Sequence, residues 1–96
     1  MNGFAGFEWD PHKGRVNVRR HGVDFADAVA VFEDERAITM WDDLTAVDEQ
    51  RWLTLGRDAR SRMLVVAYAW RGDGIRVFSA RRATASERRQ YLEEDR

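Results

Sequence analysis

Residues 62–80, RMLVVAYAWRGDGIRVFSA, predict two neighbouring strands joined by a tight turn. The segment Arg62–Trp70 is apolar on both faces of a strand, which is typical of a central strand in a sheet. The Gly-Asp-Gly sequence at 72–74 favours a hairpin turn, after which Ile75–Ala80 forms the returning strand. The sequence is therefore expected to fold around a mainly antiparallel sheet.

On the N-terminal side of this hairpin, the sequence predicts two helices. Asp10 followed by Pro11 is typical of a helix start with aspartate as the N-cap, and Gly22 is expected to end this helix after His21. A second helix is expected after the N-cap Asp24, because apolar residues recur there at helical spacing: Phe25, Ala28, Val29 and Phe32.

The remaining predicted elements are three strands and a last helix. The strands are expected at Phe4–Trp9, Arg36–Trp41 and Arg51–Gly56, with a polar loop at Asp42–Gln50. The sequence TASE at 84–87 is a capping box and predicts a helix that reaches about Glu93. The order β-α-α-β-β-β-β-α predicts an α+β fold, in which two N-terminal helices and a C-terminal helix pack on a small, mainly antiparallel, meandering sheet.

Length and composition limit the class of protein. A chain of 96 residues accommodates a single domain, expected to span residues 1–96, and is too short for Rossmann-type cofactor folds. The absence of cysteine excludes disulfides and cysteine nucleophiles. Because the sequence shows neither an apolar run of about 18 residues nor the features of a signal peptide, a cytoplasmic location is expected.

Charge is distributed unevenly along the chain. Residues 1–50 carry five basic and eleven acidic side chains, whereas residues 51–96 carry eleven basic and six acidic ones. Nearly all of the basic residues are arginines, whose planar guanidinium groups bind phosphate in a bidentate manner. Codon bias is an alternative origin for the excess of arginine. The asymmetry itself indicates one surface for a polyanion and another for a basic partner.

The first predicted helix carries candidate functional residues. Lys13, Asn17 and His21 are spaced four residues apart, so they lie along one face of the helix with Arg20 beside them. Histidine titrates near neutral pH and can transfer a proton, whereas lysine and arginine bind anions. The alternative is structural, because a histidine in the last turn also complements the negative end of the helix dipole.

The candidate residues of the C-terminal half are arginines. Arg76 is predicted to share a strand face with Phe78 and Ala80, and an arginine on an apolar face requires a partner or a ligand. Four arginines are candidates to converge at the rim of the sheet: Arg51, Arg62, Arg76 and Arg81. The alternative is that these are solvated charges that protect edge strands from aggregation.

Sequence motifs for metal or cofactor binding are not found. The two histidines, His12 and His21, do not have the spacing of metal ligands on one helix face. The sequence also lacks a nucleophile elbow and a P-loop. Neither a metal nor another cofactor is therefore expected.

The order and spacing of these residues resemble the BrnT family of toxins over nearly the whole chain, from about Phe7 to Tyr91. The N-terminal part of the match consists of FEWDP at 7–11, Lys13, Asn17, HGV at 21–23, Phe25, Ala28 and Phe32. The C-terminal part consists of Arg51, Gly56, Arg62, Leu64, RVFSARRAT at 76–84, Glu87, Arg88 and Tyr91. Two features depart from the family pattern: residues 42–49 lack a histidine that many members have, and Ser61 replaces a common glycine.

The resemblance implies a RelE-like endoribonuclease toxin of a type II toxin–antitoxin pair, which cleaves RNA without a metal through its 2′-hydroxyl and so inhibits translation and growth. It also implies a BrnA-like ribbon-helix-helix antitoxin, expected in a 2:2 complex that represses the operon through DNA contacts made by the antitoxin. On this hypothesis Arg62, Arg76 and Arg81 stabilise the scissile phosphate, and His21 transfers a proton. Residues expected to bind the RNA substrate are Lys13, Asn17, Arg20 and Arg51.

Two other classes of protein remain compatible with the same residues. A non-catalytic nucleic-acid-binding or co-repressor module would use the arginines for salt-sensitive phosphate contacts and leave RNA intact. A protein-interaction domain would use them for a protein partner, and its affinity for RNA would not fall steeply with salt.

Overall fold

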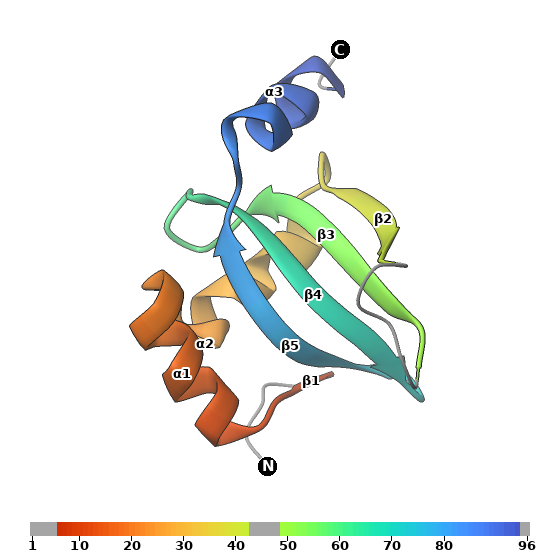
Figure 1. The fold of residues 1–96 in the computed structure, drawn as a ribbon. Helices are drawn as coiled ribbons and strands as arrows, with labels where there is room; N and C mark the ends of the chain where they lie inside the picture. Colours follow the sequence, from red (N-terminus) through yellow and green to blue (C-terminus); the bar gives the residue numbers. More distant parts are fainter. Residues whose placement is uncertain (1–5, 43–48, 95–96) are drawn as a thin grey trace.

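A computed structural model describes residues 6–42 and 49–94 of the chain, which form a five-stranded sheet with helices packed around it (Figure 1). The strands are β1 Phe7–Glu8, β2 Ile38–Asp42, β3 Arg51–Arg57, β4 Met63–Arg71 and β5 Gly74–Arg82. The helices are α1 Pro11–His21, α2 Phe25–Ala28, the 3₁₀ helix η1 Val29–Glu33 and α3 Ala85–Glu94.

The strand order is β1-β5-β4-β3-β2, so the predicted central strand β4 does lie in the middle of the sheet. Strands β2 to β5 form an antiparallel meander, and only the short β1 pairs in parallel, with β5. The predicted fold class and the order of the elements are thereby confirmed. Among the described residues, none of the helices combines the length and hydrophobicity needed to cross a bilayer.

The predicted boundaries differ from the structure by a few residues. The first strand is shorter than predicted, and the part of that prediction at residues 4–5 lies outside the described residues. The second predicted helix is α-helical only as far as Ala28, and the chain continues from Val29 as the 3₁₀ helix η1. Asp42 belongs to β2, and residues 43–48 of the predicted loop are likewise outside the described part of the chain.

Local signals in the sequence fix both ends of α1 as predicted. The side chain of Asp10 accepts a hydrogen bond from the backbone N–H of His12 at 2.8 Å. At the other end Gly22 adopts φ +68°, a left-handed conformation that favours glycine, and its N–H donates to the carbonyl of Val18 at 2.8 Å. The position of His21, directly before this cap, is therefore well defined.

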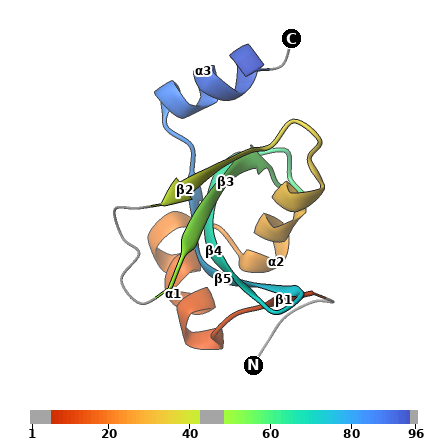
Figure 2. The same ribbon diagram turned by 90° about the vertical axis from the view of Figure 1, so that its right-hand side faces the viewer.

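The two faces of the sheet are covered differently (Figure 2). One face, called here the helix face, packs against α2 and η1 and contains the larger core, which includes Phe25, Leu64 and Val77. On the opposite face, called here the open face, a smaller core of Leu55, Val65 and Tyr91 forms below α3. Because α3 projects from one end of the sheet, it leaves the other end of the open face uncovered by this helix.

A β-bulge in β5 changes which residues reach each face. Val77 pairs with Tyr68 and Ser79 with Ala67, so Phe78 has no partner in β4. The prediction that Arg76, Phe78 and Ala80 share one face is therefore wrong for Ala80. The extra residue reverses the alternation, and Ala80 lies in the core of the helix face with Val77.

The departure from the family pattern at Ser61 falls in the turn before β4. Ser61 adopts φ +64°, in the left-handed region where a side chain is disfavoured. Glycine, which the resemblance led us to expect here, adopts this conformation without strain. The turn still forms, with the Ser61 N–H bonded to the carbonyl of Asp58 at 3.0 Å.

Candidate functional site

A pocket of about 290 Å³ opens between α1 and the uncovered end of the open face. Helix α1 contributes most of its lining, and β3 and β5 contribute the rest: Lys13, Val16, Asn17, Arg20, His21, Arg51, Phe78 and Ser79. The structure therefore brings together five of the eight residues that the sequence predicted for the site. The predicted substrate-binding residues all line the pocket, together with one predicted catalytic residue, His21.

Four of the lining residues are basic, and their side-chain nitrogen atoms have no hydrogen-bond partner among the described residues. The side chains of Lys13, Arg20, His21 and Arg51 form no hydrogen bond or ion pair with other residues in the described part of the chain. Instead, the guanidinium carbon of Arg51 lies 4.1 Å from the centroid of the Phe78 ring, and Lys13 Nζ lies 5.6 Å from it. These cation–π contacts leave the N–H groups available to an anion.

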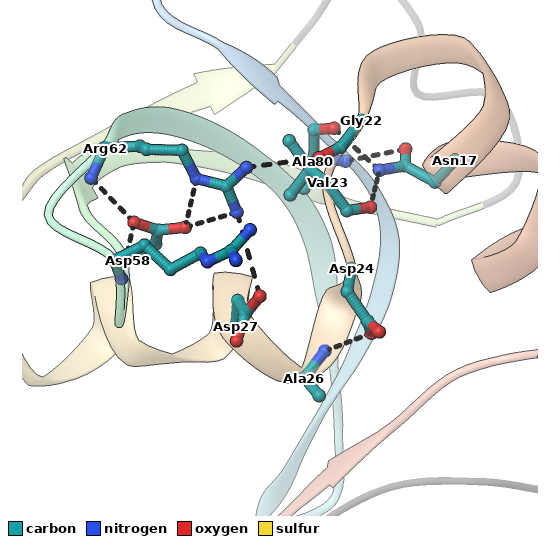
Figure 3. A network of polar contacts seen from close by, with 10 residues as sticks. Asn17, Gly22, Val23, Asp24, Ala26, Asp27, Asp58, Arg62 and Ala80 are labelled. Carbon is teal, nitrogen blue, oxygen red and sulfur yellow. Dashed lines mark hydrogen bonds and ion pairs between the residues drawn. The ribbon is translucent and has the colours of Figure 1, made fainter.

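Asn17 lines the same pocket, but its amide is used within the protein (Figure 3). Its Nδ2 donates to the carbonyls of Val23 at 2.9 Å and Ala80 at 2.8 Å, and its Oδ1 accepts from the Ala80 N–H at 3.1 Å. The Asn17 side chain is buried, and it pairs with the backbone N–H and carbonyl of Ala80 in a part of β5 that β1 does not reach. Asn17 therefore attaches α1 to the sheet.

The predicted convergence of Arg51, Arg62, Arg76 and Arg81 is not what the structure shows. Of these arginines only Arg51 lines the pocket. Arg76 and Arg81 lie on the open face, opposite Ala69 and Val65 in the strand register, so they flank the pocket along β5. Each is close to a carboxylate, since Arg76 Nη1 lies 4.0 Å from Glu8 and Arg81 forms two hydrogen bonds to Glu87 at 2.8 and 2.9 Å.

The pair formed by Arg81 and Glu87 also fixes the start of α3. The hydrogen bond from Arg81 lowers the pKa of Glu87 to about 2, against the opposing effect of burial. Glu87 also accepts from the Thr84 N–H at 2.8 Å, and its own N–H donates to the Thr84 hydroxyl at 3.1 Å. The predicted capping box is thereby confirmed, and Arg81 is tied to it.

Arg62 does not line the pocket and belongs to a polar network that reaches the end of α1 at Gly22 (Figure 3). Its Nε donates to Asp58 at 2.9 Å, and Nη2 lies 2.7 Å from the same carboxylate as an ion pair without hydrogen-bond alignment. Its Nη1 donates to the carbonyl of Gly22 at 3.1 Å. Because Gly22 caps α1, Arg62 holds the end of the helix that carries His21.

Sequence reasoning missed the other three pocket residues, Val16, Phe78 and Ser79, as parts of a site. The spacing of Val16 from Lys13 and Arg20 does place it near their helix face, which was an available signal. The position of Phe78 depends on the bulge, which the sequence pattern did not reveal. No group of three or more potential metal-ligating side chains occurs among residues 6–42 and 49–94.

The small α+β fold thus carries a pocket whose basic side chains form no ion pair in the described part of the chain, an arrangement that suits an anionic ligand. A family model described as "Ribonuclease toxin, BrnT, of type II toxin-antitoxin system" matches residues 9–87. Because this match covers most of the chain, the protein belongs to the BrnT family.

A solved structure supports the same assignment. The crystal structure of the Brucella abortus ribonuclease toxin, BrnT, is similar with a TM-score of 0.64 and 25% sequence identity. The similarity covers 81% of this chain and 95% of that chain. No curated protein sequence gives a significant match.

Proposed function

We propose that the protein is an endoribonuclease that cleaves RNA in the pocket beside α1 without a metal ion. The observation that carries the proposal is the convergence in one pocket of four basic side chains, Lys13, Arg20, His21 and Arg51, which form no hydrogen bond or ion pair with another described residue. Such a cluster suits the phosphodiester backbone of RNA, which is a polyanion. The description of the family as ribonuclease toxins supports the same activity.

The proposed reaction uses the RNA itself as the nucleophile. The 2′-oxygen attacks the adjacent phosphorus, its proton passes to a base, and the bond to the 5′-oxygen breaks. The leaving oxygen receives a proton, so the products carry a 2′,3′-cyclic phosphate and a 5′-hydroxyl. In this scheme His21 performs one of the two proton transfers, and the other three basic residues stabilise the charge on the phosphate.

The arginines outside the pocket receive different roles in this proposal. Arg76 and Arg81 lie on the same face as the pocket and would bind neighbouring phosphates, in competition with Glu8 and Glu87. For Arg62 we propose a positioning role, because its guanidinium is already bound to Asp58 and to the cap of α1.

We further propose that a protein antitoxin neutralises this chain in the cytoplasm. The type II toxin–antitoxin description of the family supports a protein partner. A BrnA-like ribbon-helix-helix antitoxin in a 2:2 complex, with its own contacts to operator DNA, is the partner that we propose. The acidic N-terminal half of the chain is suited to a basic antitoxin segment. Co-expression and the mass of the purified complex test this partner and its stoichiometry.

The activity is tested by incubating antitoxin-free protein with RNA in excess EDTA. The expected result is fragments with 2′,3′-cyclic phosphate and 5′-hydroxyl ends, and a lower rate for Arg20→Ala. Arg19→Ala is the matched control, because Arg19 is exposed on α1 but does not line the pocket. Intact RNA that binds in a salt-sensitive manner would instead indicate a non-catalytic nucleic-acid-binding module. Intact and unbound RNA would indicate that the basic residues face a protein.

A further inference from the structure

The pocket contains an apolar part that a phosphate does not require. Val16 and Phe78 lie among the basic side chains, and both are only partly buried. Hydrogen-bond donors and positive charge suffice to bind a phosphate, whereas an apolar wall contributes nothing to that contact. The mixed lining therefore suits a ligand that has both an anionic group and an apolar surface.

The aromatic ring is held at this place by the bulge in β5. This ring belongs to Phe78, which lines the pocket, whereas Val77 before it and Ala80 after it are buried in the core of the helix face. Bulges redirect side chains and are common beside functional sites. Arg51, from β3, lies over the ring with its guanidinium carbon 4.1 Å from the centroid. Two planar groups from different strands thus meet in the pocket.

We infer that Phe78 and Arg51 form a nucleobase subsite, in which one unpaired base of an RNA strand stacks while its phosphate contacts Lys13, Arg20 and His21. Bases of single-stranded RNA stack on aromatic rings and on arginine guanidinium planes in the same manner. The inference rests on the proposed function and adds to it the recognition of an unstacked base. The pocket volume of about 290 Å³ is that of a small ligand site, which suits one nucleotide rather than a duplex.

This subsite predicts that the protein prefers flexible, single-stranded RNA. In a duplex the bases are stacked on each other and their faces are not available. The ring has no donor or acceptor, so it accepts each of the four bases, with stronger binding of those that stack more strongly. Sequence preference, where present, then arises from stacking strength.

The test measures binding of a 2′-O-methyl oligoribonucleotide, which cannot be cleaved because its 2′-oxygen is blocked. An abasic residue is placed at each position in turn, and each oligonucleotide is titrated against the wild type, Phe78→Leu and Phe78→Tyr. The matched control is Trp70→Leu, which removes an exposed aromatic ring from the adjacent strand β4 outside the pocket. Thermal unfolding of each variant verifies that it is folded.

The expected result is one position at which removal of the base weakens binding to the wild type about 5- to 150-fold. At that position Phe78→Leu shows less than about a twofold loss, while Phe78→Tyr and Trp70→Leu behave as the wild type does. The inference is overturned when base removal has the same effect on the wild type and on Phe78→Leu at every position. This outcome is distinct from failure of the proposed function, in which unmodified RNA stays intact in the cleavage assay whatever the binding data show.

Discussion

The pocket beside α1 and the network around Arg62 use the same kind of side chain for different purposes. In the pocket, Arg20 and Arg51 form no hydrogen bond or ion pair with a carboxylate among the described residues. In the network, Arg62 is 12% exposed and is bound to Asp58, whose side chain is 0% exposed. The comparison teaches that the partner of an arginine, rather than its position in a motif, distinguishes a binding residue from a structural one.

The largest effect that this comparison predicts is the loss of cleavage in His21→Ala. His21 is exposed and makes no described hydrogen bond, so its removal should leave the fold intact. If it transfers a proton, kcat falls about 10²- to 10⁴-fold. Single-turnover cleavage of a labelled RNA measures the rate. An unchanged rate would remove His21 from the mechanism and leave it a structural role at the end of the helix dipole.

Arg62→Ala should show the opposite behaviour, with a large effect on stability. The substitution leaves the buried Asp58 carboxylate without its cation and releases the Gly22 carbonyl. The free energy of unfolding should fall by about 3 kcal/mol or more. Urea denaturation of Arg62→Ala beside Arg60→Ala tests this, because the exposed Arg60 is bound in the same loop only through its backbone. A stable Arg62→Ala variant that fails to cleave RNA would instead support the catalytic role that the sequence predicted for Arg62.

A third test counts the phosphate contacts of the pocket. A plot of the logarithm of RNA affinity against the logarithm of salt concentration has a slope that increases with the number of phosphate contacts. Lys13→Ala removes one such contact and should make this slope shallower by about 1. Arg15→Ala is the control, since Arg15 lies on α1 but does not line this pocket. Equal slopes for the two variants would show that α1 binds RNA through general charge rather than through the pocket.

The smallest predicted effect concerns the pair formed by Arg81 and Glu87. The hydrogen bond from Arg81 lowers the pKa of Glu87 to about 2, so in the folded state this carboxylate stays charged at pH values at which a glutamate is ordinarily protonated. Its contribution is therefore present above about pH 5 and is lost as the pH falls toward about 2. The side chains of Arg81 and Glu87 are 39% and 22% exposed, so the contribution is at most about 1 kcal/mol.

The stability of Glu87→Gln relative to the wild type, measured across this pH range, tests that pair. The difference should be largest near neutral pH and should vanish at about pH 2. Glu93→Gln makes the same change at an exposed position of α3 and serves as the control. A difference that does not depend on pH would assign the role of Glu87 to the capping box alone.

The sequence was sufficient to predict the fold because its signals are local. The caps at Asp10, Gly22 and Asp24 and the hairpin at 72–74 each depend on a few neighbouring residues, and each occurs in the structure. The candidate site was predicted less completely. The helical spacing of Lys13, Asn17 and His21 correctly indicated that they share one face, and all three line the pocket. The ion pairs of Arg62 and Arg81 could not be predicted in this way, because the periodicity of the sequence does not indicate which carboxylate each arginine contacts.

The bulge at Phe78 makes β5 respond differently to the loss and to the gain of a residue. Deletion of Phe78 would leave a regular strand in which Val77 and Ala80 still face the core of the helix face and Ser79 and Arg81 still face the other way. Insertion of one residue after Ser79 would instead turn Ala80 away from this core and direct Arg81 toward it. We expect β5 to accept the deletion of Phe78 without loss of the fold but not that insertion, which the thermal unfolding of the two variants would reveal.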